Sequence, residues 1–583
     1  MTSRQLIDNF YIYHRFTFYY LTVLILFLVQ CRFLKSKHLS AMQTRIARIV
    51  SAVAVLMLSG YIMFRNSHTV ADLSVYSSGR YVIELCLREC AGILLVCAVA
   101  CAVVDLAAIL FDKAARLSAA AASQEACPVR AAWPVRAAAA LCALLSRCRW
   151  ELVFFFICLF EMYRNTVGIG GVGGTWQSAW YAMDYSMGFG SRMLIGSFLK
   201  LIHPGYLTES FVTGFLCVVM LAMSVLLAFL FGRLVRRSDK SIRTAVIFLL
   251  LLFLVGPCSP EAVAIQYTRF DTFGILFALL SVWFGVTVLP RRPLAGNLCI
   301  TFFSVCMVLT HQGNFFTFYP IVLCMLLTRA FRGKDAAGLP KVPGWDLRGL
   351  LALGANFLIT AAAFACMQFY GTKVFRGSKL YGSVKALSKA ITKGTDINID
   401  TSADALRYEY FSDMGTTYRS TMYGLIKNEY GYNLPLIHTA LTIVFTMPAI
   451  VILLWLWKNI WKRGRSAVLP GAGKRKLSLL LRNPVTWIFL GFLFILPEFA
   501  LNVDWGRWFL AAGITWFACL FIVLACDLAG ARSILVRPSQ YIAAHPWLTA
   551  GVLVYTATLG KFHDLTWLPL TEDALNYFKL FIH

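Results

Sequence analysis

Long apolar runs separated by short polar segments dominate the chain. Many of these runs approach the ~20 residues that a helix needs to cross a bilayer. The pattern predicts an all-α, polytopic membrane protein with about 14 transmembrane helices (about 12 to 14). The predicted spans are residues 16–31, 47–64, 90–111, 150–166, 209–231, 244–258, 272–289, 298–311, 315–331, 349–371, 434–457, 485–502, 507–529 and 546–560.

Composition and charge support a membrane location. Hydrophobic residues make up 59% of the 583 residues and charged residues 14%, against roughly 25% charged in a soluble domain. The formal net charge is +26, and most Lys and Arg lie in short loops between apolar runs. The positive-inside rule then predicts a multi-pass plasma-membrane protein, a lipid bilayer as partner and both termini outside. No basic stripe with interleaved aromatics forms, so we expect no nucleic acid partner.

The spacing of the runs predicts three parts. The first three spans form an N-terminal transmembrane appendage, residues 1–112, and an Ala/Arg-rich cytoplasmic linker follows at 113–149. The transmembrane core is 150–583, with outer loops at 164–209 and 372–433. Aromatic and apolar residues in these loops favour short helices that lie over the membrane surface.

Four polar clusters lie at the ends of apolar runs, and the topology places all four on the extracytoplasmic side. Charge at the edge of a bilayer is expensive and marks candidate functional sites. The first cluster runs from Asp184 to Arg192, and Gly188 and Gly190 permit a turn that brings Arg192 back to Asp184. A carboxylate here can accept a proton from a hydroxyl or hold a divalent cation, and an arginine can bind phosphate. A local Asp–Arg pair that caps an interfacial helix is the plain alternative.

The second and third clusters contain Arg269, Asp271 and His311. Asp271 suits the positive end of a helix dipole, so a simple helix start explains it, whereas Arg269 is unfavourable there. His311 ends a short span and is followed by Gln-Gly-Asn before the next apolar run, which resembles a hairpin whose tip dips into the membrane. A lone histidine is usually structural, and the functional alternative is a hydrogen bond to a phosphate oxygen.

The fourth cluster, Asp504-Trp-Gly-Arg507, forms the whole link between two spans. An aromatic-flanked hairpin and a second clamp for an anion explain it equally well. Together the clusters supply arginines and a histidine that would stabilise charge on a phosphate leaving group, and carboxylates that would activate an acceptor. No P-loop, zinc-ligand spacing or G-x-S-x-G motif supports a different chemistry.

These outer clusters, a first outer loop with Asp184 and more than ten spans resemble the GT-C class of polyprenyl-phosphate-sugar-dependent glycosyltransferases, over residues 150–583. The resemblance implies that Asp184 is the catalytic carboxylate of the first loop. It also implies that Arg269, His311 and Arg507 contact the lipid phosphate of the donor, a polyprenyl-phosphate-linked sugar, with a glycan, lipid or protein as acceptor. The polar clusters themselves add Arg192, Asp271 and Asp504 to the expected substrate-binding residues. Many members carry a second acidic residue near that loop, whereas this chain has Asp184 alone. With a single carboxylate the resemblance assigns no definite cofactor, and a divalent cation, Mg²⁺ or Mn²⁺, is the one candidate.

Two alternatives stay open. The chain also resembles the polymerases and ligases of O-antigen and capsule assembly, which consume an undecaprenyl-diphosphate-linked glycan. The outer loop 372–433, with Arg376, Arg407 and Arg419, would be their functional loop. A transporter or flippase of lipid-linked glycans is the other alternative, but it predicts mid-span charges and repeated halves that the sequence lacks.

Overall fold

The computed structural model describes residues 148–166, 178–256, 258–259, 269–331, 345–371, 383–396, 443, 446–467, 483–501 and 505–558. The chain divides into two units, and almost all described residues belong to the one made of Val153–Thr549 and 560–571. The predicted appendage 1–112, nearly all of the linker 113–149 and most of the loop 372–433 lie outside the described residues.

The described residues form helices, with a single isolated bridge between Leu207 and Thr395 as their only β-type pairing. The first helices are α5 (Arg149–Thr166), η2 (Ser178–Tyr181), α6 (Met193–Ile202), α7 (Glu209–Arg237), α8 (Lys240–Val255), α10 (Asp271–Thr287), α11 (Pro293–Thr310), α12 (Asn314–Thr317), α13 (Tyr319–Ala330) and α14 (Leu347–Ala365). The later ones are η3 (Cys366–Gly371), α16 (Val384–Thr392), α20 (Met447–Ala467), α22 (Pro484–Phe492), η5 (Leu493–Ile495), α23 (Leu496–Leu501), α24 (Trp505–Cys526), η6 (Leu528–Leu535), α25 (Val536–Ala544) and α26 (Pro546–Thr558). The predicted all-α class therefore holds for the described residues.

Four of the described helices are long and apolar enough to cross a membrane: Glu209–Arg237, Pro293–Thr310, Leu347–Tyr370 and Arg507–Cys526. Shorter apolar helices cover Met193–Ile202, Asp271–Thr287, Asn314–Ala330 and Pro484–Ala500. The protein is thus a helical membrane protein, and the predicted number of 14 spans stays a prediction.

Helix ends follow local sequence signals. The Thr208 hydroxyl caps α7 by accepting a hydrogen bond from the Phe211 backbone N–H at 3.3 Å. Glu209 lies in the first turn and Arg236 and Arg237 in the last, where each charge complements the helix dipole. The residues at both ends of the 29-residue helix α7 therefore match the helix bounds.

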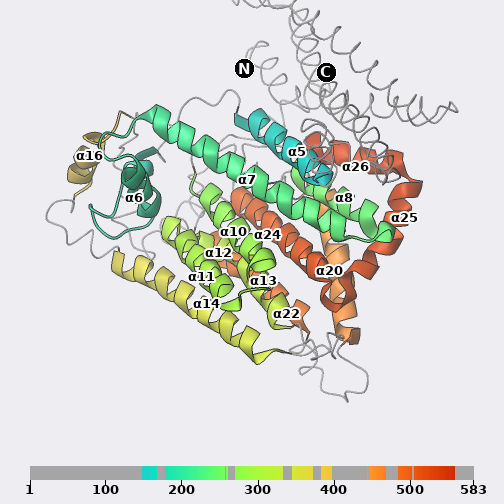
Figure 1. Cartoon of the computed structure of the whole chain (residues 1–583). Coiled ribbons are helices and arrows are strands. Elements are labelled where there is room, and N and C mark those ends of the chain that lie inside the picture. The colour runs from blue at the N-terminus through green and yellow to red at the C-terminus, as the bar shows by residue number, and fades with distance from the viewer. Residues whose placement is uncertain are drawn as a thin grey trace, which may run out of the picture. The chain divides into compact units, whose positions relative to one another are not determined.

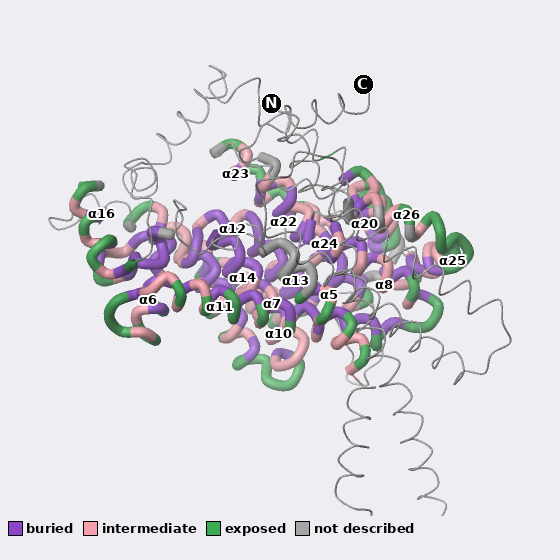
Figure 2. The backbone as a smooth tube through the Cα atoms, turned by 90° about the horizontal axis from the view of Figure 1, so that it is seen from above, coloured by how far each residue is buried: buried purple, intermediate pink, exposed green. Residues whose placement is uncertain are grey.

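The core lies where α24 and α13 pack against their neighbours. α13 contacts α14, α24, α22 and α10, and α10 contacts α7 and α11 (Figure 1). In α24, 61% of the apolar span is buried, against 17% in α14, so α24 is central and α14 peripheral. Figure 2 shows that buried residues gather in the middle of the bundle and that exposed ones lie on α6, α16 and α25.

The start of α7 is joined to the segment that follows α16. The Leu207 N–H donates to Gly394 O at 2.9 Å, and the Glu209 N–H donates to Asp396 Oδ1 at 2.7 Å. One face of α16 is buried through Leu387 and Ile391, as an amphipathic surface helix requires. In Figure 1, α6 and α16 accordingly lie at the same end of the bundle, near the start of α7.

Candidate functional site

The link between α11 and α12 holds His311 in a fixed position. The Gly313 N–H donates to His311 Nδ1 at 3.0 Å, and the Asn314 N–H donates to His311 O at 3.0 Å. A Cβ on Gly274 of α10 would lie 2.5 Å from Asn314 Oδ1, so only glycine lets α10 approach this closely. Backbone bonds and close packing therefore set the orientation of the imidazole.

Arg192 reaches His311 from the loop before α6. Its Nη2 lies 2.5 Å from His311 Nε2, and its guanidinium carbon lies 3.7 Å from the centre of the Trp180 ring. The backbone of Arg192 is left-handed, with φ 68°, which is uncommon for a residue with a side chain. Such strain persists where the surroundings require it, and here it directs a buried guanidinium at a histidine.

Arg507 and Asp271 join the starts of α24 and α10. Arg507 Nη1 donates to Asp271 Oδ2 at 3.3 Å, and the Arg507 guanidinium carbon lies 4.0 Å from the Trp508 ring centre. Asp271 is the first residue of α10, as the sequence predicts. Arg269 lies just before that helix and is 5% exposed. The second and fourth polar clusters thus come together.

The arginines of three clusters act on the same histidine, which lies after the last residue of α11. His311 is buried, and the positive charges of Arg192, Arg507 and Arg269 all act on it. Glu498 also lies close, since a Cβ on Gly313 would be 3.0 Å from its Oε1.

The hydrogen-bond pattern around His311 favours an anion. A backbone N–H can only donate, so Nδ1 is the acceptor and the proton of the neutral ring sits on Nε2. Nε2 faces Arg192, whose guanidinium also can only donate. An oxyanion at this point would accept from both groups.

Asp184 has a separate partner. Its Oδ2 is ion-paired with Lys200 of α6, and its Oδ1 accepts a hydrogen bond from the Ser186 N–H at 2.7 Å. Burial alone would raise the pKa of Asp184, but the hydrogen bonds from Lys200 and Ser186 and the Lys200 charge outweigh it and lower the pKa. The prediction that the glycine turn returns Arg192 to Asp184 is therefore wrong, because Lys200 occupies that carboxylate and Arg192 turns to His311.

A divalent cation does not fit Asp184 as it stands. The Lys200 ammonium occupies Oδ2, and a second positive charge there would be repelled. Among the residues that the structure describes, no group of three or more His, Cys, Asp or Glu side chains is placed to hold a metal ion.

The structure thus brings together Arg192, Arg269, Asp271, His311 and Arg507, while Asp184 lies in the same loop as Arg192 with its own ion pair; Asp504 lies outside the described residues. The Ser191 hydroxyl donates to Gln312 Oε1 and ties that loop to the His311 link. Sequence reasoning missed Lys200. Its one signal was a lone cation in the otherwise apolar α6.

Comparison of the chain with protein-family models, with curated proteins and with solved structures finds no match.

Proposed function

We propose that the chain is an integral membrane glycosyltransferase that moves a sugar from a polyprenyl-phosphate donor to an envelope acceptor on the extracytoplasmic face. The observation that carries the proposal is the contact of Arg192 with buried His311, on which the charges of Arg269 and Arg507 also act. The guanidinium fork matches phosphate oxygens. As the bond between the sugar and the phosphate breaks, charge grows on the leaving phosphate, and preorganised donors stabilise it.

His311 would donate its Nε2 proton in a hydrogen bond to a phosphate oxygen between itself and Arg192. Without a ligand, the Arg192 and His311 donors face each other. With a phosphate oxygen between them, each would donate a hydrogen bond to that oxygen, which is why a phosphate fits this position. Two carboxylates also lie in this region: Asp271 pairs with Arg507, and Glu498 lies close to Gly313.

Asp184 would take the proton of the acceptor hydroxyl. A general base must be ionised, as Asp184 is at neutral pH, although its lowered pKa makes it a weak base while Lys200 holds it. The acceptor would approach Oδ2 and displace the Lys200 ammonium from it. The sugar's anomeric carbon would then lie between the activated hydroxyl and the departing phosphate.

The test separates binding from transfer. Arg192→Gln should weaken binding of polyprenyl monophosphate by roughly tenfold or more, measured by native mass spectrometry, because a charge-assisted contact is lost. Asp184→Asn should leave that binding unchanged but abolish transfer of radiolabelled sugar from lipid-linked donors in membranes. Transfer retained by a folded Asp184→Asn protein would refute the role of the base.

The polymerase or ligase alternative is favoured by one observation, the engagement of Asp184 with Lys200 instead of the arginines. That function depends on the arginines and takes a diphosphate-linked glycan. Loss of activity in Arg192→Gln together with full activity in Asp184→Asn would favour it. Movement of a lipid-linked sugar across vesicles without any transfer would favour a transporter.

A further inference from the structure

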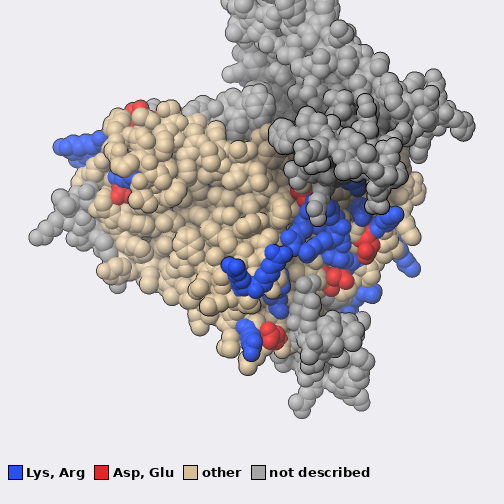
Figure 3. All heavy atoms as spheres, in the orientation of Figure 1, with Lys and Arg blue, Asp and Glu red and all other residues tan. Residues whose placement is uncertain are grey.

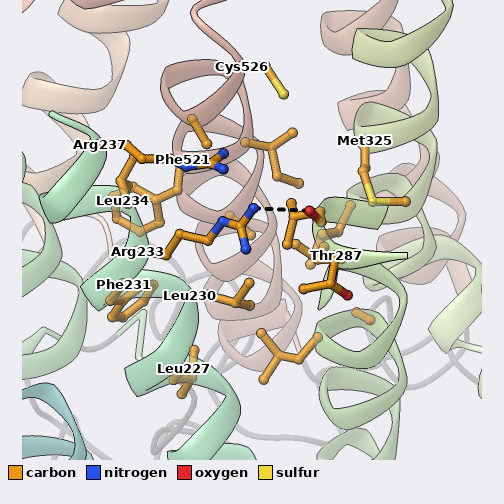
Figure 4. Close-up of a pocket in the computed structure, with 18 of the residues that line it drawn as sticks. Leu227, Leu230, Phe231, Arg233, Leu234, Arg237, Thr287, Met325, Phe521 and Cys526 are labelled. Carbon is orange, nitrogen blue, oxygen red and sulfur yellow. Dashed lines mark hydrogen bonds between the residues drawn. The ribbon is translucent and has the colours of Figure 1, made fainter. Parts of the chain in front are cut away.

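A cavity of about 510 Å³ opens between α7, α10, α13 and α24. Its lining runs along α10 from Ile275 to Thr287 and along α24 from Ile514 to Cys526. The arginines of the lining lie at or beyond the last turns of α7, α10 and α13, so they are at the opposite end of α10 from Asp271. A volume of this size is typical of small-molecule sites. Figure 4 shows side chains of α7 reaching into the space towards the facing helices.

Most of the cavity is lined by apolar side chains, and basic side chains line its rim. Leu227, Phe231, Ile275, Ile514 and Phe521 are among the many apolar lining residues. The charged lining residues are all arginines: Arg233, Arg237, Arg291 and Arg329, and no acidic residue is among the described residues that line it. In Figure 3, Lys and Arg gather on this part of the surface, whereas the face over the middle of the bundle is almost uncharged.

Helix capping explains two of the four arginines. Arg233 Nη2 donates to Val286 O at 3.2 Å, and Arg329 Nη2 donates to Gly285 O at 2.8 Å, so both satisfy carbonyls at the end of α10. The exposed Arg237 and Arg291 make no such bond in the described residues. Hydrogen bonds from arginines to the end of α10 also do not explain why an apolar cavity lies next to them.

An apolar hollow with a cationic rim matches an amphiphile with an anionic head. Basic pockets between transmembrane helices on the cytoplasmic side bind anionic lipid head groups, and the basic loops assign this end to the cytoplasm. We propose that this cavity binds an anionic phospholipid of the adjacent leaflet, with its phosphate at Arg237 and Arg291 and one acyl chain between α7, α10 and α24. The site is independent of the proposed sugar transfer.

The test uses the purified full chain in detergent and its melting temperature. Phosphatidylglycerol should raise the melting temperature, whereas phosphatidylcholine, which has no net charge, and glycerol 3-phosphate, which has no acyl chain, should not. An equal rise with phosphatidylcholine would overturn the role of the arginines. An equal rise with glycerol 3-phosphate would reduce the cavity to a site for a free anion and overturn the lipid proposal. All three comparisons use the wild-type protein.

Variants then locate the two parts of the lipid. The double variant Arg237→Gln/Arg291→Gln should need roughly tenfold or more phosphatidylglycerol for the same rise in melting temperature. Arg292→Gln, at an exposed arginine outside the lining, should need no more than the wild type. Ala518→Phe should fill the hollow and abolish the response to lipid, while Ala222→Phe, outside the cavity, should retain it. The proposal would be contradicted if the Ala518→Phe protein still gained melting temperature from phosphatidylglycerol. It would also be contradicted if Arg292→Gln lost that gain as fully as the double variant.

Discussion

Arg192 adopts a backbone conformation that destabilises the chain locally, and the contacts of its side chain explain why the fold retains it. A non-glycine residue in the left-handed region costs about 1–3 kcal/mol. Its guanidinium lies over Trp180 and beside His311, both buried. These contacts offset the backbone strain, and in the proposed function the guanidinium that they position binds the phosphate.

The Asp184–Lys200 pair gives a prediction with a definite sign. The pKa of Asp184 is lower in the folded protein than its ordinary 3.8, so the folded state binds fewer protons than the unfolded state. The pair therefore stabilises fully above that value, and this stability is lost as pH falls through the lowered pKa. Lys200→Gln removes the hydrogen bond and the charge that lower the pKa of Asp184, so that pKa should rise towards or above 3.8. The folded and unfolded states then bind nearly the same number of protons, so the variant should lose less stability on acidification than the wild type.

The measurement is the melting temperature in detergent from about pH 3 to about pH 6, the range in which carboxyl groups titrate. Lys389→Gln, at an exposed lysine of α16, is the control and should follow the wild-type curve. An unchanged acid limb in Lys200→Gln would show that Lys200 does not set the pKa.

At the level of single residues, the sequence located the polar clusters but did not show which of their side chains contact one another. Asp271 at a helix start follows from local dipole chemistry. The Arg192–His311 and Arg507–Asp271 contacts join residues far apart in the chain, and no local pattern specifies them. Lys200 went unnoticed because a single cation near a helix end has an ordinary explanation.

Helix α6 positions Asp184 through a glycine. A Cβ on Gly196 would lie 1.8 Å from Met183 O, so the Gly196→Ala protein must move α6 or the backbone beside Asp184. We expect a destabilisation of about 1–3 kcal/mol and loss of transfer. Gly214→Ala, where a Cβ meets open space, should instead be neutral or stabilise α7 by about 0.5–1 kcal/mol. Chemical unfolding in detergent compares the two, and equal effects would contradict the close approach.

The starts of α10 and α24 should be energetically coupled through Asp271 and Arg507. The pair is largely shielded from solvent, with side-chain exposures of 9% and 21%. A double-mutant cycle with Asp271→Asn and Arg507→Gln should give an interaction energy of about 0.5–3 kcal/mol. Additive effects of the two substitutions on the free energy of unfolding would show that the contact contributes nothing.

At the level of elements, apolar length predicted the helices well. Helices α7, α10, α11, α13, α14 and α24 lie on predicted spans. The prediction for 434–457 was less accurate, because α20 continues to Ala467 through Trp461 and basic residues that hydropathy treats as loop. The span at 485–502 consists of α22, η5 and α23, since a change of helical pitch leaves no mark in hydropathy.

For the whole molecule, the account requires that α7 crosses the membrane with its start outside. A small epitope inserted at Gly205, where the chain has open space, should bind antibody on intact cells. The same epitope at exposed Asp239, beyond the basic end of α7, should bind only after permeabilisation. Both sites accessible on one side, or the reverse pattern, would contradict the orientation.

The central claim is that the arginines around His311 hold the phosphate of a lipid-linked sugar. The most direct measurement is a cryo-electron microscopy map of the protein in nanodiscs with polyprenyl monophosphate. We expect phosphate density within hydrogen-bonding distance of Arg192 and His311. Density for the phosphate only at the opposite cavity, beside Arg237 and Arg291, or an unchanged Arg192–His311 contact at saturating lipid, would contradict it.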